Sequence, residues 1–557
     1  MAGKNKKNIN VIPLGGLGEL GKNMLLIEYA GKILVLDAGL MLPEEEMLGI
    51  DCVIPDISYL LENRSRIQGI ILSHGHEDHI GALPYILRDL PVPVYGTAFT
   101  LGLLRNKLRE AKYGEQEVSL QELKVGESFS LGIFKLDIMH VNHNIPDAVA
   151  ISVHTGAGII VYTGDFKFDQ TPVDGKLIDI GGLASLGDQG VLLLLAESTN
   201  AEKPGYANSE RQVAKGIDKI LLQAKGRVII ATYASNLHRV QQILERAQAR
   251  GRKVVLLGNS LIDSVQTALQ LGYFNFPQDL LVSWEELAQL PLESQLVLAS
   301  GKRGNPFSIL APLAMGGERD FKINKDDIVV VAASSVRGNG KILTRIIDQL
   351  FLEGAQVIYE DNAGINASGH GQQEELKMML NLVRPRYFVP IHGEYRQLVH
   401  HTKLAEAVGI PADNIFILEN GSILELGPNS ARIAGKVTAG KVLVDGLGVG
   451  DVGKVVLRDR HQLSQDGILI AVITMSKEQK KIIAGPDLIS RGFVYVRESE
   501  SLMDEAKEQV RQILETCAEK QITEWGTIKN KVRESLGKFL YDRTRRRPMI
   551  LPIIMEI

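Results

Sequence analysis

The feature that most constrains this 557-residue chain is the hexapeptide HGHEDH at residues 74–79, which directly follows a short apolar run. Four strong metal-ligand side chains therefore lie in one turn at the end of a predicted strand. His74 and His76 can face one ion, whereas Asp78 and His79 can turn toward a second. Imidazole and carboxylate ligands suit zinc, with manganese as an alternative. An isolated His-x-His is usually a solvated loop, but four ligands in six residues predict a two-metal site.

The length of the chain exceeds what one hydrophobic core usually serves, so two or three domains are expected. The hydrophobic fraction of 45% and the net charge of -4 are those of an ordinary globular protein. A mildly acidic total leaves nucleic acid open as a partner, because a local basic groove can still bind phosphates.

The compartment is predicted from the cysteines and from the absence of targeting patterns. Cys52 and Cys517 form no CxxC pattern, so no disulfide framework or cysteine zinc site is indicated, and a reducing cytoplasm fits best. No signal-peptide pattern is visible at the amino terminus. No run approaches the roughly 20 apolar residues that cross a bilayer. We therefore expect a soluble, cytoplasmic protein without a membrane partner.

The pattern of predicted strands and helices changes along the chain. The first 200 residues alternate short β-branched runs with turns, whereas strands alternate with longer amphipathic helices from about residue 209, which is typical of a parallel βα arrangement. The stretch 427–440 bears glycine and proline and is predicted to be a linker. Beyond it, two amphipathic helices and a final strand indicate a small domain. The clearest predicted helices are 101–112, 209–224, 237–250, 372–382, 504–520 and 524–540, and predicted strands include 32–36, 158–162, 387–391 and 549–554.

Further metal-type residues also follow predicted strands. Asp37, Asp165 and His392 each close one, and His143 lies in a polar stretch after another. In layered α/β proteins, side chains that leave strand ends converge on a common crevice. Each residue alone has a plainer interpretation, since an aspartate before glycine often caps a turn and a lone histidine is more often structural.

Together these residues resemble a known family. Asp37, the hexapeptide, His143, Asp165 and His392 resemble the two-zinc form of the metallo-β-lactamase fold. The middle of the chain is similar to the β-CASP group, which acts on nucleic acids, in the segments 197–201, 209–211, 232–239, 368–371 and 390–396. Over nearly its whole length the chain resembles the bacterial ribonuclease J family, including the segments 446–453, 486–493 and 546–556.

The resemblance implies an α/β fold: a metallo-β-lactamase αββα sandwich, an inserted β-CASP α/β domain and a small C-terminal α/β domain. The implied limits are 1–208 for the first part of the metallo-β-lactamase domain, 209–360 for the β-CASP domain, 361–426 for the second part of the metallo-β-lactamase domain, 427–440 for the linker and 441–557 for a C-terminal oligomerisation domain.

The resemblance also implies roles in catalysis. It places one metal on His74, His76 and His143 and the other on Asp78, His79 and His392, with Asp165 bridging. Two ions about 3.5 to 4 Å apart can activate water and stabilise a phosphoryl group. Asp37 would support the ligands without binding a metal. His370 would lie near the scissile phosphate, with Glu197 as its acidic partner in moving a proton.

Substrate binding is implied for two segments. The first consists of Asn366, Ala367, Ser368, Gly369 and His370, where a Ser-Gly turn offers backbone N–H groups to an anion. The second consists of Ser235, Asn236, His238 and Arg239, at a strand-to-helix junction whose amides favour phosphate. A capped helix is the alternative interpretation of the second segment. A basic run could also attract RNA, although a solvated charged face is the commoner role of such runs; it consists of Arg543, Arg545, Arg546 and Arg547.

The chain departs from the family pattern near the expected substrate. Asn366 replaces the first histidine of the family's His-x-Ser-Gly-His, and Glu197 stands where aspartate is commoner. The loop at 300–306 and the segment 258–260 also differ. Additional positive charge comes from Lys302, Arg303 and Arg337. The metal ligands are all present, so hydrolysis is better supported than the family's selectivity for the RNA 5′ end.

The resemblance implies a metal-dependent ribonuclease, acting as a 5′-to-3′ exonuclease and an endonuclease in mRNA decay and rRNA maturation. Its substrate would be single-stranded RNA with a 5′-monophosphate. It would hold two Zn²⁺ per subunit, with Mn²⁺ as an alternative, and a structural Ca²⁺ near Leu48, Ile50 and Asp445. It would form a homodimer or homotetramer, or pair with a paralogous subunit. The alternative is an RNA-binding partner subunit of a ribonuclease complex with weak or no catalysis.

Overall fold

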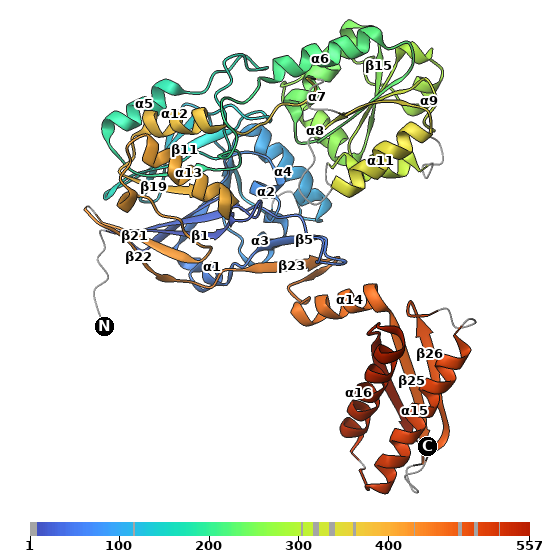
Figure 1. Ribbon diagram of the computed structural model, residues 1–557. Helices are drawn as coiled ribbons and strands as arrows, with labels where there is room; N and C mark the ends of the chain where they lie inside the picture. The colour runs from blue at the N-terminus through green and yellow to red at the C-terminus, as the bar shows by residue number, and fades with distance from the viewer. Residues whose placement is uncertain are drawn as a thin grey trace. The chain divides into compact units, whose positions relative to one another are not determined.

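The computed structural model describes two units of the chain (Figure 1). By their contacts, one unit comprises Met1–Leu42 and Cys52–Val442, and the other comprises Pro43–Asp51 and Leu443–Ile557. The additional positive charge noted in the sequence lies outside the described residues. It belongs to Lys302, Arg303 and Arg337. The described residues are 8–114, 117–301, 305–315, 322–333, 340–359, 364–427, 429–476, 482–494, 499–522 and 524–556.

Two stacked sheets form the centre of the first unit. The first sheet has the order β22-β21-β1-β3-β4-β6-β7-β8 and the second has the order β19-β13-β12-β11-β10-β9. The strands of the first are Ile9–Gly15 (β1), Met24–Tyr29 (β3), Lys32–Leu36 (β4), Ile67–Ile71 (β6), Val94–Gly96 (β7), Leu120–Glu122 (β8), Ser422–Leu426 (β21) and Ala431–Lys436 (β22). Those of the second are Ser128–Leu131 (β9), Phe134–His140 (β10), Val149–Thr155 (β11), Gly158–Tyr162 (β12), Val191–Glu197 (β13) and Tyr387–Ile391 (β19).

The core between these sheets is built from the inward-facing side chains of their strands. Leu34 and Ile71 of the first sheet lie in one buried cluster with Ile151, Leu195 and Val389 of the second. A second cluster packs the outer face of the second sheet against helices. The helices of this layered part are Ser58–Glu62 (α1), Glu77–Ile80 (α2), Leu83–Asp89 (α3), Ala98–Glu110 (α4), Ile180–Gln189 (α5), Gln373–Val383 (α12) and Tyr395–Ala407 (α13).

An inserted α/β domain is built on a five-stranded sheet of order β15-β16-β14-β17-β18, in which every pairing is parallel. Both of its faces are covered, as parallel sheets require: Val228 and Ile230 pack on one side, and Ile229 and Ala231 on the other. Its strands are Val228–Thr232 (β14), Lys253–Leu257 (β15), Gln295–Ala299 (β16), Ile328–Ala332 (β17) and Gln356–Ile358 (β18). Its helices are Glu210–Gln223 (α6), Leu237–Ala249 (α7), Asn259–Gln270 (α8), Trp284–Ala288 (α9), Phe307–Ala314 (α10) and Gly340–Leu352 (α11).

The second unit holds a three-stranded sheet of order β26-β25-β27 with two long helices on one face. Its elements are Gly448–Val449 (β24), Lys454–Asp466 (α14), Ile468–Met475 (β25), Ile482–Arg491 (β26), Glu500–Glu519 (α15), Trp525–Thr544 (α16) and Met549–Glu556 (β27). Four further short strands of the chain are Leu17–Gly18 (β2), Cys52–Pro55 (β5), Gly393–Glu394 (β20) and Lys441–Asp445 (β23).

The structure confirms the predicted α/β class, while the predicted domain limits stay predictions. The stretch 427–440, predicted as a linker, contains strand β22, which pairs with β21 in the first sheet. Gly427 and Gly440 of this stretch flank the strand, and Gly435 lies within it, so this part of the chain belongs to the sheet. Among the helices in the described ranges, none has both the length and the apolar character that a membrane crossing demands.

Candidate metal centre

The carboxyl ends of parallel strands supply most residues of the site. In the first sheet, β4 leads to Asp37, and β6 to the hexapeptide. In the second, parallel strands β12, β13 and β19 lead to Asp165, Glu197 and His392. Parallel neighbours end at one edge, so residues remote in sequence meet there. The backbones of Asp37 and His392 have φ of 59° and 47°, a strained conformation for residues other than glycine and one that clusters at functional sites.

A first group of four buried residues could hold a metal ion. One potential ligand atom from each lies within 4.8 Å of the others. His74 Nε2 and His143 Nε2 lie 3.6 and 3.8 Å from Asp165 Oδ2, and His143 Nε2 lies 3.2 Å from His76 Nδ1. Among the described residues, His74 Nε2 and Asp165 Oδ2 are buried without a hydrogen-bond partner. Because unpaired buried polar atoms are costly, these atoms fit metal ligands.

A second group shares Asp165 with the first. Asp78, His79 and His392 bring their ligand atoms within 4.8 Å of one another and of Asp165. His79 Nε2 lies 3.4 Å from Asp165 Oδ2, and His392 Nε2 lies 3.2 Å from Asp78 Oδ2. The structure thus brings together all seven residues that the family resemblance assigns to the two metals. Their binding of metal remains a prediction.

Backbone carbonyls orient two of the imidazoles. His143 Nδ1 donates to the carbonyl of Gly369 at 2.7 Å, and His76 Nε2 approaches the carbonyl of Ser235 at 3.4 Å. In each ring the other nitrogen then faces the site with its lone pair. Gly369 permits this approach, because a Cβ there would lie 2.7 Å from His143 Cε1.

Asp37 holds the hexapeptide from behind. Its carboxylate accepts hydrogen bonds from Ser73 N and Ser73 Oγ, both at 2.7 Å, and from the hydroxyl of Tyr162. The same carboxylate lies 2.7 Å from His79 Nδ1. These bonds leave it no free face toward the site, which suits the supporting role predicted for it. Sequence reasoning missed Ser73 and Tyr162.

Asn23 is a further buried residue that sequence reasoning missed. Its Nδ2 lies 3.0 Å from the carbonyl of Asp78, 3.3 Å from Asp78 Oδ2 and 3.1 Å from His79 Nε2. A nearby glycine makes the close packing of this loop possible, since a Cβ on Gly39 would lie 1.6 Å from the Asp78 carbonyl. Neither residue belongs to a recognisable motif, so no sequence signal marked them.

The carboxylates and imidazoles of the site shift the pKa values of one another. Burial lowers the pKa values of His74 and His143, and the neighbouring imidazoles lower them further. Burial would also lower the pKa of His392, but Asp165 and Asp78 outweigh it and raise this pKa to about 10. Without a cation, protons would therefore balance the carboxylates, and metal binding must displace them.

Glu197 and His370 form a pair beside Asp165. His370 Nδ1 donates to Glu197, whose two carboxylate oxygens lie 3.1 and 2.9 Å away, and Glu197 also accepts from Phe166 N at 2.9 Å. Burial would lower the pKa of His370, but the Glu197 carboxylate raises it above its usual value. His370 is the more exposed partner, with 22% of its side chain accessible. A protonated imidazole at this position can donate a proton.

The predicted substrate segment at 366–370 is tied to the sheet by Asn200. Its Nδ2 donates to Ser368 Oγ at 2.7 Å and to the His370 carbonyl at 2.9 Å. The Nδ2 of Asn366 is buried and has no partner among the described residues. An acceptor such as a phosphate oxygen would satisfy that amide. Asn200 is another residue that sequence reasoning did not assign to the site.

The second predicted substrate segment is engaged within the protein instead. All five N–H groups of Arg239 are used by Glu210, by the carbonyls of Ala332 and Ala367, and by Asn366 Oδ1. This leaves Arg239 no donor for phosphate and gives it the role of fastening residues 366–367 to the inserted domain.

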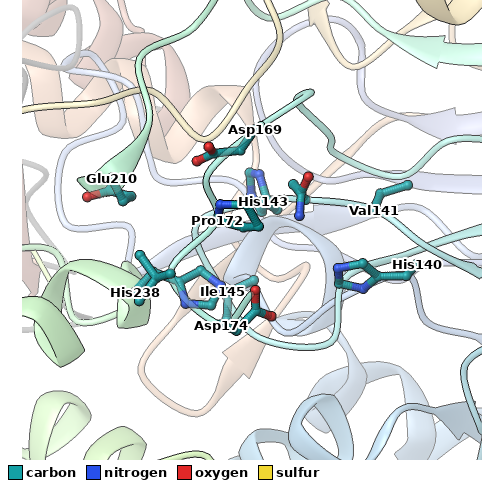
Figure 2. Close-up of a pocket in the computed structure, with 11 residues that line it drawn as sticks. His140, Val141, His143, Ile145, Asp169, Pro172, Asp174, Glu210 and His238 are labelled. Atoms are coloured by element: carbon teal, nitrogen blue, oxygen red, sulfur yellow. The ribbon is translucent and has the colours of Figure 1, made fainter. Parts of the chain in front are cut away.

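The other residues of that segment are also occupied. Asn236 caps α7 by accepting from Arg239 N at 3.2 Å, and the backbone N of His238 donates to the Asn144 carbonyl. The capped-helix interpretation, which the sequence left open, therefore fits Asn236. Figure 2 shows His238 and His140 on opposite sides of Asp174 in a small pocket that His143 also lines. Burial lowers the pKa values of both His238 and His140, which favours uncharged rings there.

The predicted calcium site does not fit the structure. Arg460 donates from Nη2 to the Asp445 carboxylate and from Nη1 to the Leu48 carbonyl at 2.9 Å. Ile50 has a buried side chain, and its backbone N donates to Met47 O. A guanidinium already supplies positive charge to the oxygens that a calcium ion would need, so no calcium is assigned.

Four family models match successive parts of the chain. They describe the metallo-β-lactamase superfamily (17–207), the β-CASP domain of ribonuclease J (225–350), a Zn-dependent metallo-hydrolase RNA specificity domain (361–416) and the ribonuclease J C-terminal domain (455–557). Fold and site thus define a metallo-β-lactamase protein of the β-CASP type.

Curated relatives narrow this class. The chain is 45% identical to Ribonuclease J2 of Bacillus subtilis (strain 168), with 100% of both chains covered. It is 42% identical to Ribonuclease J 2 of Staphylococcus aureus (strain NCTC 8325 / PS 47), with 100% of this chain and 99% of that protein covered. This chain belongs to the ribonuclease J family, as the sequence motifs predicted.

A solved structure supports the fold alone. A protein of unknown function from Enterococcus faecalis V583 aligns with a TM-score of 0.53 at 17% identity, covering 75% of this chain and 100% of that one.

The role of Asp37 can be tested through metal affinity. Asp37→Asn should weaken zinc binding about 10- to 100-fold, because His79 loses the carboxylate that fixes its tautomer. Competition with a chromogenic zinc chelator at constant pH measures the affinity. Asp137→Asn is a matched control, since Asp137 also holds a histidine, His154 Nε2 at 2.6 Å, outside the metal groups. Equal affinities of the two variants would contradict the role.

Proposed function

We propose that this chain hydrolyses RNA phosphodiester bonds with two metal ions, as a 5′-to-3′ exonuclease and an endonuclease in mRNA decay and rRNA maturation. The observation that carries the proposal is the pair of ligand groups that share Asp165 in a chain of the ribonuclease J family. Zinc suits the imidazole and carboxylate donors, and manganese is the alternative. His74 Nε2 and Asp165 Oδ2, which lack hydrogen-bond partners among the described residues, support metal occupancy.

Two divalent cations would supply Lewis-acid stabilisation of the phosphoryl oxygens and lower the pKa of an attacking water. The protein's part is to fix seven donors in place before substrate arrives, through Asp37, Asn23 and the carbonyls of Ser235 and Gly369. Such preorganisation avoids rearrangement during the reaction.

His370 and Glu197 serve proton transfer in the proposed reaction. Glu197 raises the pKa of His370, although burial opposes it, so the ring carries a proton that it can give to the departing oxygen or use to steady negative charge. Glu197 is fully buried and bonded to Phe166 N, so its carboxylate also fixes the direction of the ring. His370 would touch the reacting group, and Glu197 would position it.

Single-stranded RNA with a 5′-monophosphate is the proposed substrate. The unpartnered amide of Asn366 and the Ser368-Gly369 turn offer neutral donors beside the metal groups. Because Arg239 is fully engaged, these neutral donors would contact the phosphate in its place. Neutral donors discriminate less between phosphate charges than an imidazolium would, so weak 5′-end selectivity is proposed.

The proposed assembly is a homodimer or homotetramer, or a pairing with a paralogous subunit, in the cytoplasm. The C-terminal sheet packs Leu469, Ala471 and Ile473 against α15 and α16. Its other face exposes Ile489 and Ile553, 44% and 38% accessible, among other apolar residues. An apolar sheet face of this kind suits a second subunit. The buried thiols of Cys52 and Cys517 fit a reducing compartment.

A partner subunit with weak or no catalysis is the second candidate. The observation that favours it is Asn366, whose amide replaces a basic group of the family next to the catalytic pair. A complete set of metal ligands favours the enzyme.

The two candidates differ in RNA cleavage. Purified protein with zinc or manganese should release mononucleotides from 5′-labelled RNA and shorter fragments from internally labelled RNA. The Asp78→Ala, His79→Ala double variant should lose at least about 100-fold in rate, because one metal loses two ligands. Chelation should have the same effect. Wild-type protein that binds RNA without cutting it would establish the partner subunit instead.

The selectivity for the 5′ end depends on Asn366. Asn366→His should change the ratio of cleavage rates on 5′-monophosphate and 5′-triphosphate RNA about 10-fold, because an imidazolium and an amide interact differently with phosphate charge. Rates on both substrates, before and after the change, measure it. Gln373→His serves as a control that adds a histidine on nearby helix α12. An unchanged ratio in Asn366→His would refute this assignment.

A further inference from the structure

The C-terminal domain contains a groove whose charge contrasts with that of the whole chain. Helices α14 and α16 and strand β27 border it, all in the second unit (Figure 1). Its volume of ≈ 730 Å³ could admit nucleotide-sized groups. Among the described residues, one acidic side chain, Asp459, and four basic side chains line it. The basic residues are Arg458, Arg533, Lys538 and Arg547.

Most of this charge is uncompensated. Arg458 pairs with Asp459 at 3.2 Å. Arg533, Lys538 and Arg547 are exposed, and none of them forms an ion pair with another described residue. Three clustered positive charges in a chain with a net charge of -4 create a local field that attracts a polyanion.

The groove also contains an oriented guanidinium group and has an open floor. The Arg547 guanidinium lies 4.5 Å from the centre of the Tyr541 ring, which holds it in a defined orientation. Guanidinium planes of this kind can stack with exposed bases. Gly537, inside helix α16, leaves the floor open, because a Cβ there would meet only Ile550 Cδ1, at 3.7 Å.

The arginines of the run at 543–547 make different contacts. Arg543 pairs with Glu505, and Arg546 donates to the Phe493 carbonyl at 2.9 Å. Arg545 lies against Tyr541, 5.3 Å from its centre, and only Arg547 lines the groove. The basic run of the sequence is therefore mostly a solvated or internally bonded segment, and the groove draws its other charges from α14 and α16.

We propose that this groove binds the sugar-phosphate backbone of single-stranded RNA, so that the C-terminal domain holds the substrate while the metal centre cuts it. Phosphates would lie against Arg533, Lys538 and Arg547, and the Arg547–Tyr541 stack would accept a base. The inference rests on the proposed function, because RNA is taken to be the substrate of the metal centre.

The test compares two triple variants of the full-length protein. Arg533→Gln, Lys538→Gln and Arg547→Gln neutralise the groove, and Lys507→Gln, Arg511→Gln and Lys520→Gln remove as much charge from the same domain outside it. Binding of a labelled single-stranded RNA is measured in EDTA, which prevents cleavage, across a range of salt concentrations. Hydrolysis of a trinucleotide with added metal is measured separately, and the mass of each variant in solution is recorded.

Each lost contact with single-stranded RNA makes the slope of log affinity against log salt shallower by about 0.7, so three lost contacts make it shallower by about 2. Relative to the affinity at 1 M salt, the affinity at 0.1 M salt then falls by about 100-fold. The groove variant should show this loss, and the control variant should stay within about twofold of wild type. Trinucleotide hydrolysis should be unchanged in both, because it needs the metal centre alone.

Unchanged RNA binding in the groove variant, or equal losses in both variants, would overturn the proposal. So would a loss that accompanies a change in mass, because the groove would then be an interface between copies. Failure of wild-type protein to hydrolyse any RNA would refute the proposed function, while the binding comparison would still decide the role of the groove.

Discussion

The contacts of one buried carboxylate organise the site. Asp165 lies between 2.7 and 3.8 Å from nitrogens of five histidines, His74, His79, His143, His370 and His392. A charge removed from water in this way is stable only when positive charge balances it. Protons on His79 and His392 could do so, but His74 and His143 resist protonation. Cations between the rings would satisfy both the carboxylate and the neutral imidazoles.

The fold brings these groups together by aligning strand ends. Two sheets end in parallel neighbours at one edge, and the chain leaves the second sheet after β13, builds the inserted domain and returns through β19. Arg239 fastens residues 366–367 to that inserted domain by hydrogen bonds. The segment that would contact RNA is therefore fixed by the insert at one end and by Asn200 near the other. This arrangement explains how the candidate substrate segment and the two candidate ligand groups, from distant parts of the chain, keep one geometry.

The sequence predicted the elements that carry periodic or motif signals. The predicted strand at 387–391 coincides with β19, and the predicted helix at 372–382 differs from α12 by one residue at each end. The seven candidate ligands also come together, because six of them close a strand or lie in the hexapeptide and His143 lies in the polar stretch that follows β10. Such signals are local, so a single sequence displays them.

The contacts that sequence did not reveal are between remote residues or through backbone atoms. Asn23 reaches Asp78 across 55 positions, and the carbonyl of Ser235 approaches His76 across 159. Arg239 has the residue type of a phosphate binder, yet its tertiary neighbours take every donor. Arg460 likewise occupies the place that the family resemblance gave to calcium. A residue's type shows what it can bond, whereas its neighbours decide what it does bond.

The most direct test of the two-metal centre is elemental analysis of protein that has been loaded with zinc and freed of excess metal by gel filtration. Two ligand groups that share Asp165 should hold two equivalents of zinc per chain, and metal should be lost when Asp165 is replaced by Asn. One equivalent or none in the wild-type protein would contradict it.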